Sequence, residues 1–266
     1  MFLTDEERTL TDTFLDKGYV IRPAADKAAL DWIRDQFFLL AQDTLGIKSG
    51  MPAEQFLDTI HERVTPRELN DFRLKMIRGV NANNKFRLAY YQIAKPYLDV
   101  LVGNELAMQL RVNLSIQLPG DDSSLLPLHA DTWSGDSPFE VVVWLPLVHC
   151  YGTKAMYLLP PKASAALSGR FSCTQVASSE SLYAEISDRV ERLEIAYGDV
   201  MVFNQALPHG NRVNLEHETR WSMNCRFKGL FTPYGDKKLG EFFEPVTLRA
   251  ASRVGMAYRH PGEGRS

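Results

Sequence analysis

The sequence has few cysteines, no large excess of either charge and no long hydrophobic run. Only 3 of its 266 residues are cysteines, and their wide spacing and odd number fit neither a disulfide framework nor a CxxC zinc pair. The 30 basic and 33 acidic residues give a net charge of -3, so charge gives no reason to expect nucleic acid or an anionic membrane as the main partner. The longest apolar run, near residues 141–148, is too short to cross a bilayer as a helix.

The amino-terminal residues also lack a targeting pattern. The chain starts with Met-Phe-Leu-Thr-Asp-Glu-Glu, without the basic and apolar regions of a secretory signal. We therefore expect a soluble, cytoplasmic protein with no integral membrane segment. Apolar residues make up 45% of the chain and charged residues 24%, an ordinary globular composition that excludes a disordered or collagen-like chain.

The first hundred residues have the periodicity of helices. Asp26 is placed to cap a helix whose apolar residues recur every three or four positions. A capping box at Thr65, followed by Pro66 at the first helical position, begins another helix. The predicted helices cover residues 5–17, 26–45, 65–77 and 85–102, and the last is kinked or restarted at Pro96.

After Gly103 the pattern changes to short strands. Residues 110–118 alternate apolar and polar side chains, which is typical of a strand with one polar face. Because Gly and Pro turns separate these segments and helices do not alternate regularly with them, we expect an antiparallel sandwich or barrel. Further strands are predicted at residues 19–21, 140–147, 155–159, 190–195, 199–204 and 220–227, and a helix within residues 242–259.

Three residues in this second part are candidate metal ligands. His129 and Asp131 are two positions apart, so on an extended segment both side chains point to the same side. His209, just past the strand at residues 199–204, is the best candidate for a third ligand. Two histidines and one carboxylate leave three open positions on octahedral iron(II), which suits oxygen activation. Taken singly, a loop carboxylate bonded to a histidine would explain the pair, and ordinary packing would explain His209.

A candidate anion site follows eleven residues after His209. Arg220 and Ser222 share one face of a predicted strand, and a guanidinium with a hydroxyl can bind a carboxylate through charge-assisted hydrogen bonds. A surface ion pair would also explain Arg220. The order of the motifs favours the functional interpretation, because the polar-faced strand, the His-x-Asp pair, the later histidine and the Arg-x-Ser pair follow one another along the chain.

In this order the motifs resemble the double-stranded β-helix of the iron(II)/2-oxoglutarate-dependent oxygenases, most closely the phytanoyl-CoA-dioxygenase-like branch. The whole-chain layout is also similar to oxygenases encoded in bacterial surface-carbohydrate gene clusters. The matching segments cover a little under half of the chain. They are HADTW at 129–133, VWLPL at 143–147, MYLLP at 156–160, YGDVMVF at 197–203, HG at 209–210 and RWS at 220–222.

The resemblance implies a fold class and a domain layout. The expected fold is α+β and mostly β, with a jelly-roll, cupin-like double-stranded β-helix core supported by amino-terminal helices. The whole chain, residues 1–266, would be a single oxygenase domain. Within it, residues 1–103 would be the helical support, 104–232 the core and 233–266 a carboxy-terminal extension.

The resemblance also implies a role for each motif. His129, Asp131 and His209 would bind iron(II) and carry the catalysis. Arg220 and Ser222 would bind the distal carboxylate of the cosubstrate 2-oxoglutarate, and O2 would be the second cosubstrate. The carboxylate at position 131 favours hydroxylation, because related halogenases have a small residue there.

A polar residue from an early strand would complete the cosubstrate site. Asn113, Ser115 and Gln117 all lie on one face of the predicted strand, and Gln117 is our preferred choice among them. All three share the alternation of residues 110–118, so the pattern alone leaves the other two open.

Three further residues are candidates for substrate binding. Trp133 would point the same way as Asp131 and form a wall of the pocket, unless it is a packed loop aromatic. Arg212 would meet a phosphate or carboxylate at the barrel rim, with a solvated loop charge as the alternative. Arg226 would neutralise an anionic group of the substrate, or would be paired structurally with a carboxylate.

The expected activity is hydroxylation of a small molecule with release of succinate and CO2. The substrate would be a sugar or a surface-polysaccharide precursor, which places the chain in carbohydrate biosynthesis. The motifs do not distinguish hydroxylation from desaturation, epimerisation or ring closure, and they make no prediction of the oligomeric state. Two alternatives stay open: a catalytically silent β-barrel that binds carbohydrate or serves as a scaffold, and a cupin-like metalloenzyme that does not use 2-oxoglutarate.

Overall fold

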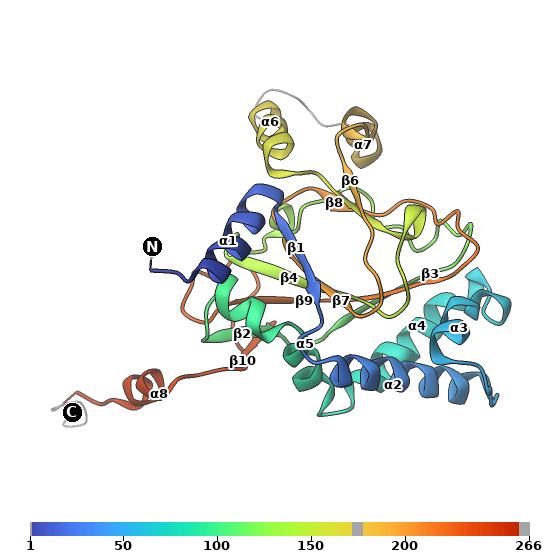
Figure 1. Ribbon diagram of the computed structural model, residues 1–266, viewed down its shortest axis with the longest axis horizontal. Coiled ribbons are helices and arrows are strands. Elements are labelled where there is room, and N and C mark those ends of the chain that lie inside the picture. The colour runs from blue at the N-terminus through green and yellow to red at the C-terminus, as the bar shows by residue number, and fades with distance from the viewer. Residues whose placement is uncertain (1, 172–177, 261–266) are drawn as a thin grey trace.

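The computed structural model of the protein describes residues 2–171 and 178–260. It is a mixed α+β structure in which two antiparallel sheets lie between groups of helices (Figure 1). Helices α2 to α5 lie on the outer side of the larger sheet, and the smaller sheet lies on its other side. The described helices are α1 (Asp5–Lys17), α2 (Lys27–Leu45), α3 (Ala53–Asp58), α4 (Pro66–Asn81), α5 (Phe86–Leu101), α6 (Pro161–Phe171), α7 (Ser179–Ile186) and α8 (Ala250–Ala257).

The helices predicted in the first hundred residues are present, and local capping explains their ends. Helix α1 begins at a capping box on Thr4 and ends at Gly18, which has a φ of 80° that favours glycine. The Asp26 side chain accepts a hydrogen bond from the backbone of Ala29 and so caps α2. Helix α4 continues past the predicted end, and α5 contains Pro96 without stopping there.

The larger sheet has seven strands and the smaller one has three. The order in the larger sheet is β1-β7-β4-β9-β2-β10, with β3 also paired to β9, and the order in the smaller sheet is β6-β5-β8. The strands are β1 (Tyr19–Pro23), β2 (Leu106–Gln109), β3 (Asn113–Gln117), β4 (Glu140–Pro146), β5 (Met156–Leu158), β6 (Glu191–Leu193), β7 (Asp199–Asn204), β8 (His209–Gly210), β9 (Arg220–Gly229) and β10 (Phe243–Pro245).

Strand β4 divides the core into two layers. Its residues Val141 and Val143 pack in the cluster that joins the larger sheet to the helices, whereas Val142 and Trp144 pack in a second cluster together with residues of the smaller sheet. Successive side chains of a strand point to opposite faces, so a strand buried on both faces has to be apolar throughout. This explains the continuous apolar run in the sequence.

Strand β9 faces the same two layers but is apolar on only one of them. Trp221, Met223, Cys225 and Phe227 are buried in the helix-side cluster, so the residues between them face the other way. The indole of Trp221 is fully buried and donates a hydrogen bond to the carbonyl oxygen of Leu57 at 2.9 Å. The helical layer therefore fixes the side of the sheet to which the polar residues of β9 point.

Several expectations about secondary structure are wrong. The tail predicted as a helix over residues 242–259 contains β10, which pairs with β2, and only then the short helix α8. Helices α6 and α7 lie between β5 and β6 and were not predicted. Pairing with other strands or packing on the sheet decides these segments, and neither is encoded in local periodicity.

Two further findings concern the cysteines and the ability of the helices to span a membrane. Cys150 and Cys225 are buried free thiols, and Cys173 lies outside the described residues. Among residues 2–171 and 178–260, no helix combines the length and the apolar character that a membrane span requires.

We predict that Trp221→Phe lowers the free energy of unfolding by about 1–3 kcal/mol, because the indole hydrogen bond to the carbonyl of Leu57 is lost and the smaller ring leaves a void. Chemical denaturation measures this change. Trp32→Phe on α2 is the control and should cost less, because Trp32 is only partly buried. Equal losses in the two variants would contradict the anchoring role of Trp221.

Candidate metal centre

His129, Asp131 and His209 come together beside the smaller sheet. Each offers one ligand atom, and these atoms lie within 4.8 Å of one another. Within the described part of the chain, no other group of three or more His, Cys, Asp or Glu side chains is arranged in this way. The sequence-predicted triad is thus brought together in space, and its role as a metal site stays a prediction.

Backbone pairing holds the two histidines side by side. The amide of His129 donates to the carbonyl of His209 at 3.0 Å, and the amide of His209 donates back at 2.8 Å. Residues that exchange both hydrogen bonds lie directly opposite each other, with their side chains on one face. Ala130 is extended, so Asp131 points to the same side as His129, and its amide donates to the carbonyl of Gln205 at 3.0 Å.

Each imidazole is oriented by the chain just before it. The Nδ1 atom of His129 lies 2.7 Å from the carbonyl oxygen of Pro127, and that of His209 lies 2.8 Å from the carbonyl oxygen of Leu207. A carbonyl oxygen only accepts hydrogen bonds, so each Nδ1 carries the proton and donates it. Both Nε2 lone pairs are left available for a metal, as is usual for metal-binding histidines.

His209 is the more buried of the two histidines. The edge of its ring meets Phe203, with ring centroids 5.0 Å apart. Burial, aided by the neighbouring His129, lowers the pKa of His209 to about 4. The imidazole is therefore neutral at physiological pH, so protons do not compete with a metal for Nε2.

Asp131 is held by an arginine. Its Oδ2 atom lies 2.7 Å from Nη2 of Arg226, and its Oδ1 atom lies 3.5 Å from Nε2 of His129. Arg226 also lies 3.3 Å from Asp136 and donates to Gln205 at 3.0 Å. Of the two roles considered for Arg226, the structure therefore shows the pairing with a carboxylate, although the residue also lines the cavity.

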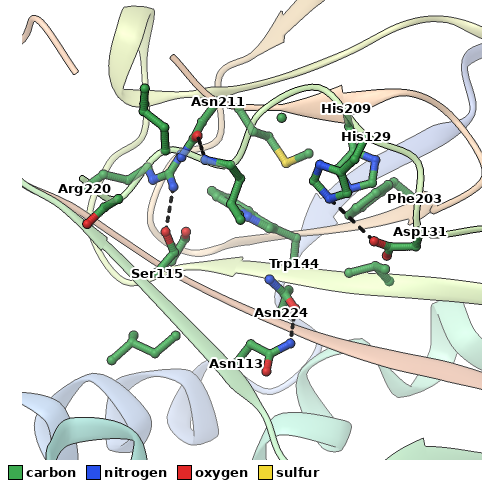
Figure 2. A pocket seen from close by; sticks show the side chains of 18 of the residues that line it. Asn113, Ser115, His129, Asp131, Trp144, Phe203, His209, Asn211, Arg220 and Asn224 are labelled. Atoms are coloured by element: carbon green, nitrogen blue, oxygen red, sulfur yellow. Dashed lines mark hydrogen bonds and ion pairs between the residues drawn. The ribbon is translucent and has the colours of Figure 1, made fainter. Parts of the chain in front are cut away.

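The triad opens into a cavity of about 470 Å³. In Figure 2 the two histidines and Asp131 lie at one end, Arg220 and Ser115 lie at the other, and Trp144 lies between them. The cavity has apolar walls formed by side chains such as Trp144, Met156 and Phe203. Its polar lining includes Arg73, Asn113, Ser115, Ser123, Ser124 and Asn224.

Arg220 is a buried cation without a carboxylate partner among the described residues. Its side chain donates from Nη2 to the hydroxyl of Ser115 at 2.7 Å, and its Nε atom has no hydrogen-bond partner. The residue is 2% exposed, and burial lowers the pKa of its guanidinium. A buried charge without a counter-ion is costly by several kcal/mol, so this end of the cavity is suited to an anion.

Ser222 accompanies Arg220 as the sequence predicts. It is buried on the same face of β9, lines the cavity and lies opposite Ser115 in the β3–β9 pairing. The structure therefore brings both residues of the Arg-x-Ser pair to the cavity.

The polar face of β3 is divided between the cavity and a structural contact. Asn113 and Ser115 line the cavity, whereas Gln117 is not among the lining residues. The side-chain amide of Gln117 instead donates to the backbone carbonyl of Arg212 at 2.6 Å, in the loop that follows β8. The placement corrects our preference for Gln117, because Asn113 and Ser115 are the residues of this face that reach the cavity.

Trp133 and Arg212 lie outside the cavity lining. The expectation for Trp133 assumed an extended chain, but the segment Asp131–Ser134 forms a 3-10 helix, so the alternation ends and the residue is 49% exposed. Arg212 pairs with Glu180 of α7 at 2.7 Å and stacks on Tyr183. The insertion that contains α7 was not predicted, so this partner could not be foreseen.

A loop that the sequence patterns did not predict also lines the cavity, and we call it the roof segment. Residues 118–128 lead from β3 to His129, and Ser123 to Leu126 line the cavity. The roof segment is pinned at two points: the amide of Gly120 donates to the carbonyl of Asn214 at 2.7 Å, and Leu126 and Asn211 exchange hydrogen bonds. Arg73 of α4 was also missed, because nothing in a helical pattern marks a residue that reaches a cavity in another layer.

Comparisons with known proteins find similarity in structure only. No protein-family model matches the sequence, and no curated protein matches it. The non-heme α-ketoglutarate-dependent carbocyclase SnoK from nogalamycin biosynthesis is 14% identical, with a TM-score of 0.56 over 92% of this chain and 97% of SnoK. The non-heme monooxygenase ThoJ, solved as a nickel complex, is 15% identical, with a TM-score of 0.54 over 91% of this chain and 85% of ThoJ.

A third similar structure was solved with both a metal and the keto acid. HygX from Streptomyces hygroscopicus, with nickel and 2-oxoglutarate bound, is 16% identical, with a TM-score of 0.50 over 89% of this chain and 90% of HygX. At such low identities the likeness concerns the fold alone. The chain thus has the mixed α+β fold of non-heme enzymes that use 2-oxoglutarate, and it carries a His-Asp-His group of its own.

We predict that His209→Ala weakens the binding of nickel(II) or manganese(II) by at least about tenfold, because one of three ligand atoms is lost. Isothermal titration calorimetry measures this directly. His149→Ala is the matched control, because His149 is exposed, stacks on Tyr151 and lies outside the cavity lining. Unchanged metal affinity in His209→Ala would contradict the assignment of the metal centre.

Proposed function

We propose that this chain is an iron(II)- and 2-oxoglutarate-dependent oxygenase that hydroxylates a small molecule and releases succinate and CO2. The observation that carries the proposal is the buried guanidinium of Arg220, which has no carboxylate partner among the described residues and lies in the same cavity as the His129, Asp131 and His209 group. A metal site and a carboxylate site at opposite ends of one cavity fit a dicarboxylate whose keto end chelates the metal.

The donor set fits the proposed cofactors. Two neutral imidazole nitrogens and one carboxylate form the ligand set of non-heme iron(II) centres that keep open positions. At the other end, Arg220 would bind the distal carboxylate of 2-oxoglutarate, with the hydroxyls of Ser115 and Ser222 beside it. A scaffold or a silent carbohydrate-binding barrel would have no use for an uncompensated buried cation.

The finer fold assignment belongs to the same proposal. Residues from β3, β4 and β9 of the larger sheet and from β5 and β8 of the smaller sheet line one cavity. This arrangement supports a double-stranded β-helix of the jelly-roll type, with residues 1–266 as a single oxygenase domain. We also propose that the chain belongs to the phytanoyl-CoA-dioxygenase-like branch of these oxygenases, because its motifs resemble that branch.

The side chains of the cavity position the reactants and exclude water. With iron(II), 2-oxoglutarate and O2 the site would have an oxidant for C–H bonds: one oxygen atom of O2 would enter succinate and the other the substrate hydroxyl, and this chemistry would come from the cofactors. The rings of Trp144 and Phe203 and the side chain of Met156 form apolar walls, which keep water from the reacting centre. Arg220 would fix the cosubstrate at its far end, so that the ketone meets the metal in one orientation.

The polar part of the cavity supports a hydroxyl-rich substrate, such as a sugar or a surface-polysaccharide precursor. The amide of Asn113 donates to the side-chain oxygen of Asn224 at 2.9 Å. This bond leaves the acceptor of Asn113 and the donor groups of Asn224 for further partners. Arg73, which forms no ion pair within the described residues, adds a cation to the lining and suits a phosphate or carboxylate on the substrate.

We predict that anaerobic addition of iron(II) and 2-oxoglutarate produces a metal-to-ligand charge-transfer absorption. In Arg220→Gln the affinity for 2-oxoglutarate should fall about 30-fold or more, because the bound carboxylate loses a buried charge partner. Titration of the absorption band measures this affinity.

Arg63→Gln is the control for this titration, because Arg63 interacts with Glu62 and lies outside the cavity lining. If wild-type protein never shows the band, the proposed function is wrong. A band that titrates equally well in Arg220→Gln would instead show that the carboxylate is bound elsewhere.

We predict that Arg73→Gln reduces the preference for phosphorylated substrates about tenfold, which corresponds to one lost hydrogen bond to a charged group. Succinate formation is measured on pairs of sugars with and without a phosphate group, and KM is compared within each pair. Arg67→Gln on the same helix is the control, because Arg67 is exposed and outside the lining. An equal preference in wild type and Arg73→Gln would contradict the binding of a substrate phosphate by Arg73.

A further inference from the structure

The side chain of Arg226 is fixed beside the Asp131 carboxylate by contacts on all its nitrogen atoms. Nη2 lies 2.7 Å from Oδ2 of Asp131, Nε donates to Gln205 at 3.0 Å, and Nη1 lies 3.4 Å from the side-chain oxygen of Gln109. The side chain is only 14% exposed. With its donors used in this way, the guanidinium of Arg226 is oriented toward the carboxylate within the cavity lining.

The surroundings of Arg226 also hold its charge in place. Asp136, whose side chain is buried, lies 3.3 Å from Nε of Arg226 and is paired with Lys237 of the segment before β10. The side-chain amide of Gln205 donates to the carboxylate of Glu140 at 2.8 Å. The backbone carbonyl of Gln205 accepts a hydrogen bond from the backbone amide of Asp131. One buried network therefore fixes both the backbone of Asp131 and the arginine that binds its side chain.

The two oxygens of the Asp131 carboxylate are thereby made unequal. Oδ2 is taken by a charge-assisted hydrogen bond to Arg226, which is among the strong kinds of hydrogen bond. Oδ1 lies 3.5 Å from the Nε2 atom of His129, and Asp131 offers one carboxylate oxygen to the group of three ligand atoms. A metal at this site meets one free carboxylate oxygen rather than two.

We propose that Arg226 is a positioning residue that restricts Asp131 to binding metal through one oxygen. With one oxygen bound, the protein leaves three of the six coordination positions of the metal open instead of two. This inference rests on the proposed function, because it concerns iron(II) with 2-oxoglutarate bound. Two imidazoles and one carboxylate oxygen use three of six octahedral positions, and a chelating keto acid uses two more. One position is left for a further ligand, and a carboxylate binding through both oxygens would fill it.

The experiment uses nitric oxide as a probe ligand for the remaining position on iron(II). The full-length protein is loaded anaerobically with iron(II), and the electron paramagnetic resonance signal of the iron–nitrosyl is measured per bound iron, with and without 2-oxoglutarate. Wild type should give the signal in both samples. Arg226→Gln should give it without 2-oxoglutarate and lose most of it when 2-oxoglutarate is added, because the keto acid and nitric oxide then compete.

Two further variants separate positioning from a general structural role. Arg226→Lys keeps a positive donor near Asp131 and should recover part of the signal in the presence of 2-oxoglutarate. Arg34→Gln is the matched control: Arg34 pairs with Glu54 at 3.2 Å, its side chain is 18% exposed and it lies outside the cavity lining. This control should bind 2-oxoglutarate and nitric oxide together, as wild type does.

The outcomes distinguish this inference from the proposed function. If wild type lacks the charge-transfer band of the 2-oxoglutarate complex, the proposed function itself fails. If the band is present and Arg226→Gln still binds both ligands at once, the role of Arg226 is overturned. Should Arg226→Gln fail to fold, a crystal structure of wild type with manganese(II) decides: one Asp131 oxygen on the metal and the other on Arg226 supports the inference, and two oxygens on the metal overturn it.

Discussion

Strand β9 lies between the helical layer and the cavity, and the strict alternation of its side chains sets the geometry of the whole site. Trp221 and the apolar residues that follow it at every second position are buried against the helical layer. The intervening residues Arg220, Ser222, Asn224 and Arg226 are thereby directed to the cavity. A shift of one residue in the register of β9 would bury charges in the helical core and expose an indole to the cavity, so packing of the helices and construction of the site depend on the same pairing.

The two arginines on this face have contrasting electrostatic surroundings. Arg226 lies between two carboxylates of the chain, whereas Arg220, six residues earlier, has a serine and, in the described part of the chain, no acid beside it. In a buried setting such a difference is large, because a missing counter-ion is not replaced by water. The positive charge of Arg226 is therefore balanced by carboxylates of the chain, whereas that of Arg220 has no carboxylate partner among the described residues.

Local signals in the sequence predicted what depends on neighbouring residues. The capping residues of α1 and α2, the strand at Asp199–Asn204 and the shared side of His129 and Asp131 follow from short-range patterns. Trp133 and Gln117 were misplaced because a 3-10 turn and a loop carbonyl, respectively, decide their orientation. Arg73 and the partner of Arg212 come from other layers of the fold, and no periodicity in one chain encodes such distant contacts.

The roof segment, residues 118–128, joins β3 to His129 and is held near both of its ends, at Gly120 and at Leu126. Between these two anchors, the stretch that contacts the cavity contributes no metal ligand and no part of either sheet. Loops anchored in this way accept substitutions and changes of length at little cost to the scaffold. The lining of the cavity can therefore change through substitutions in this segment while the positions of His129, Asp131 and His209 are kept, which offers protein engineers a short and separable region to randomise.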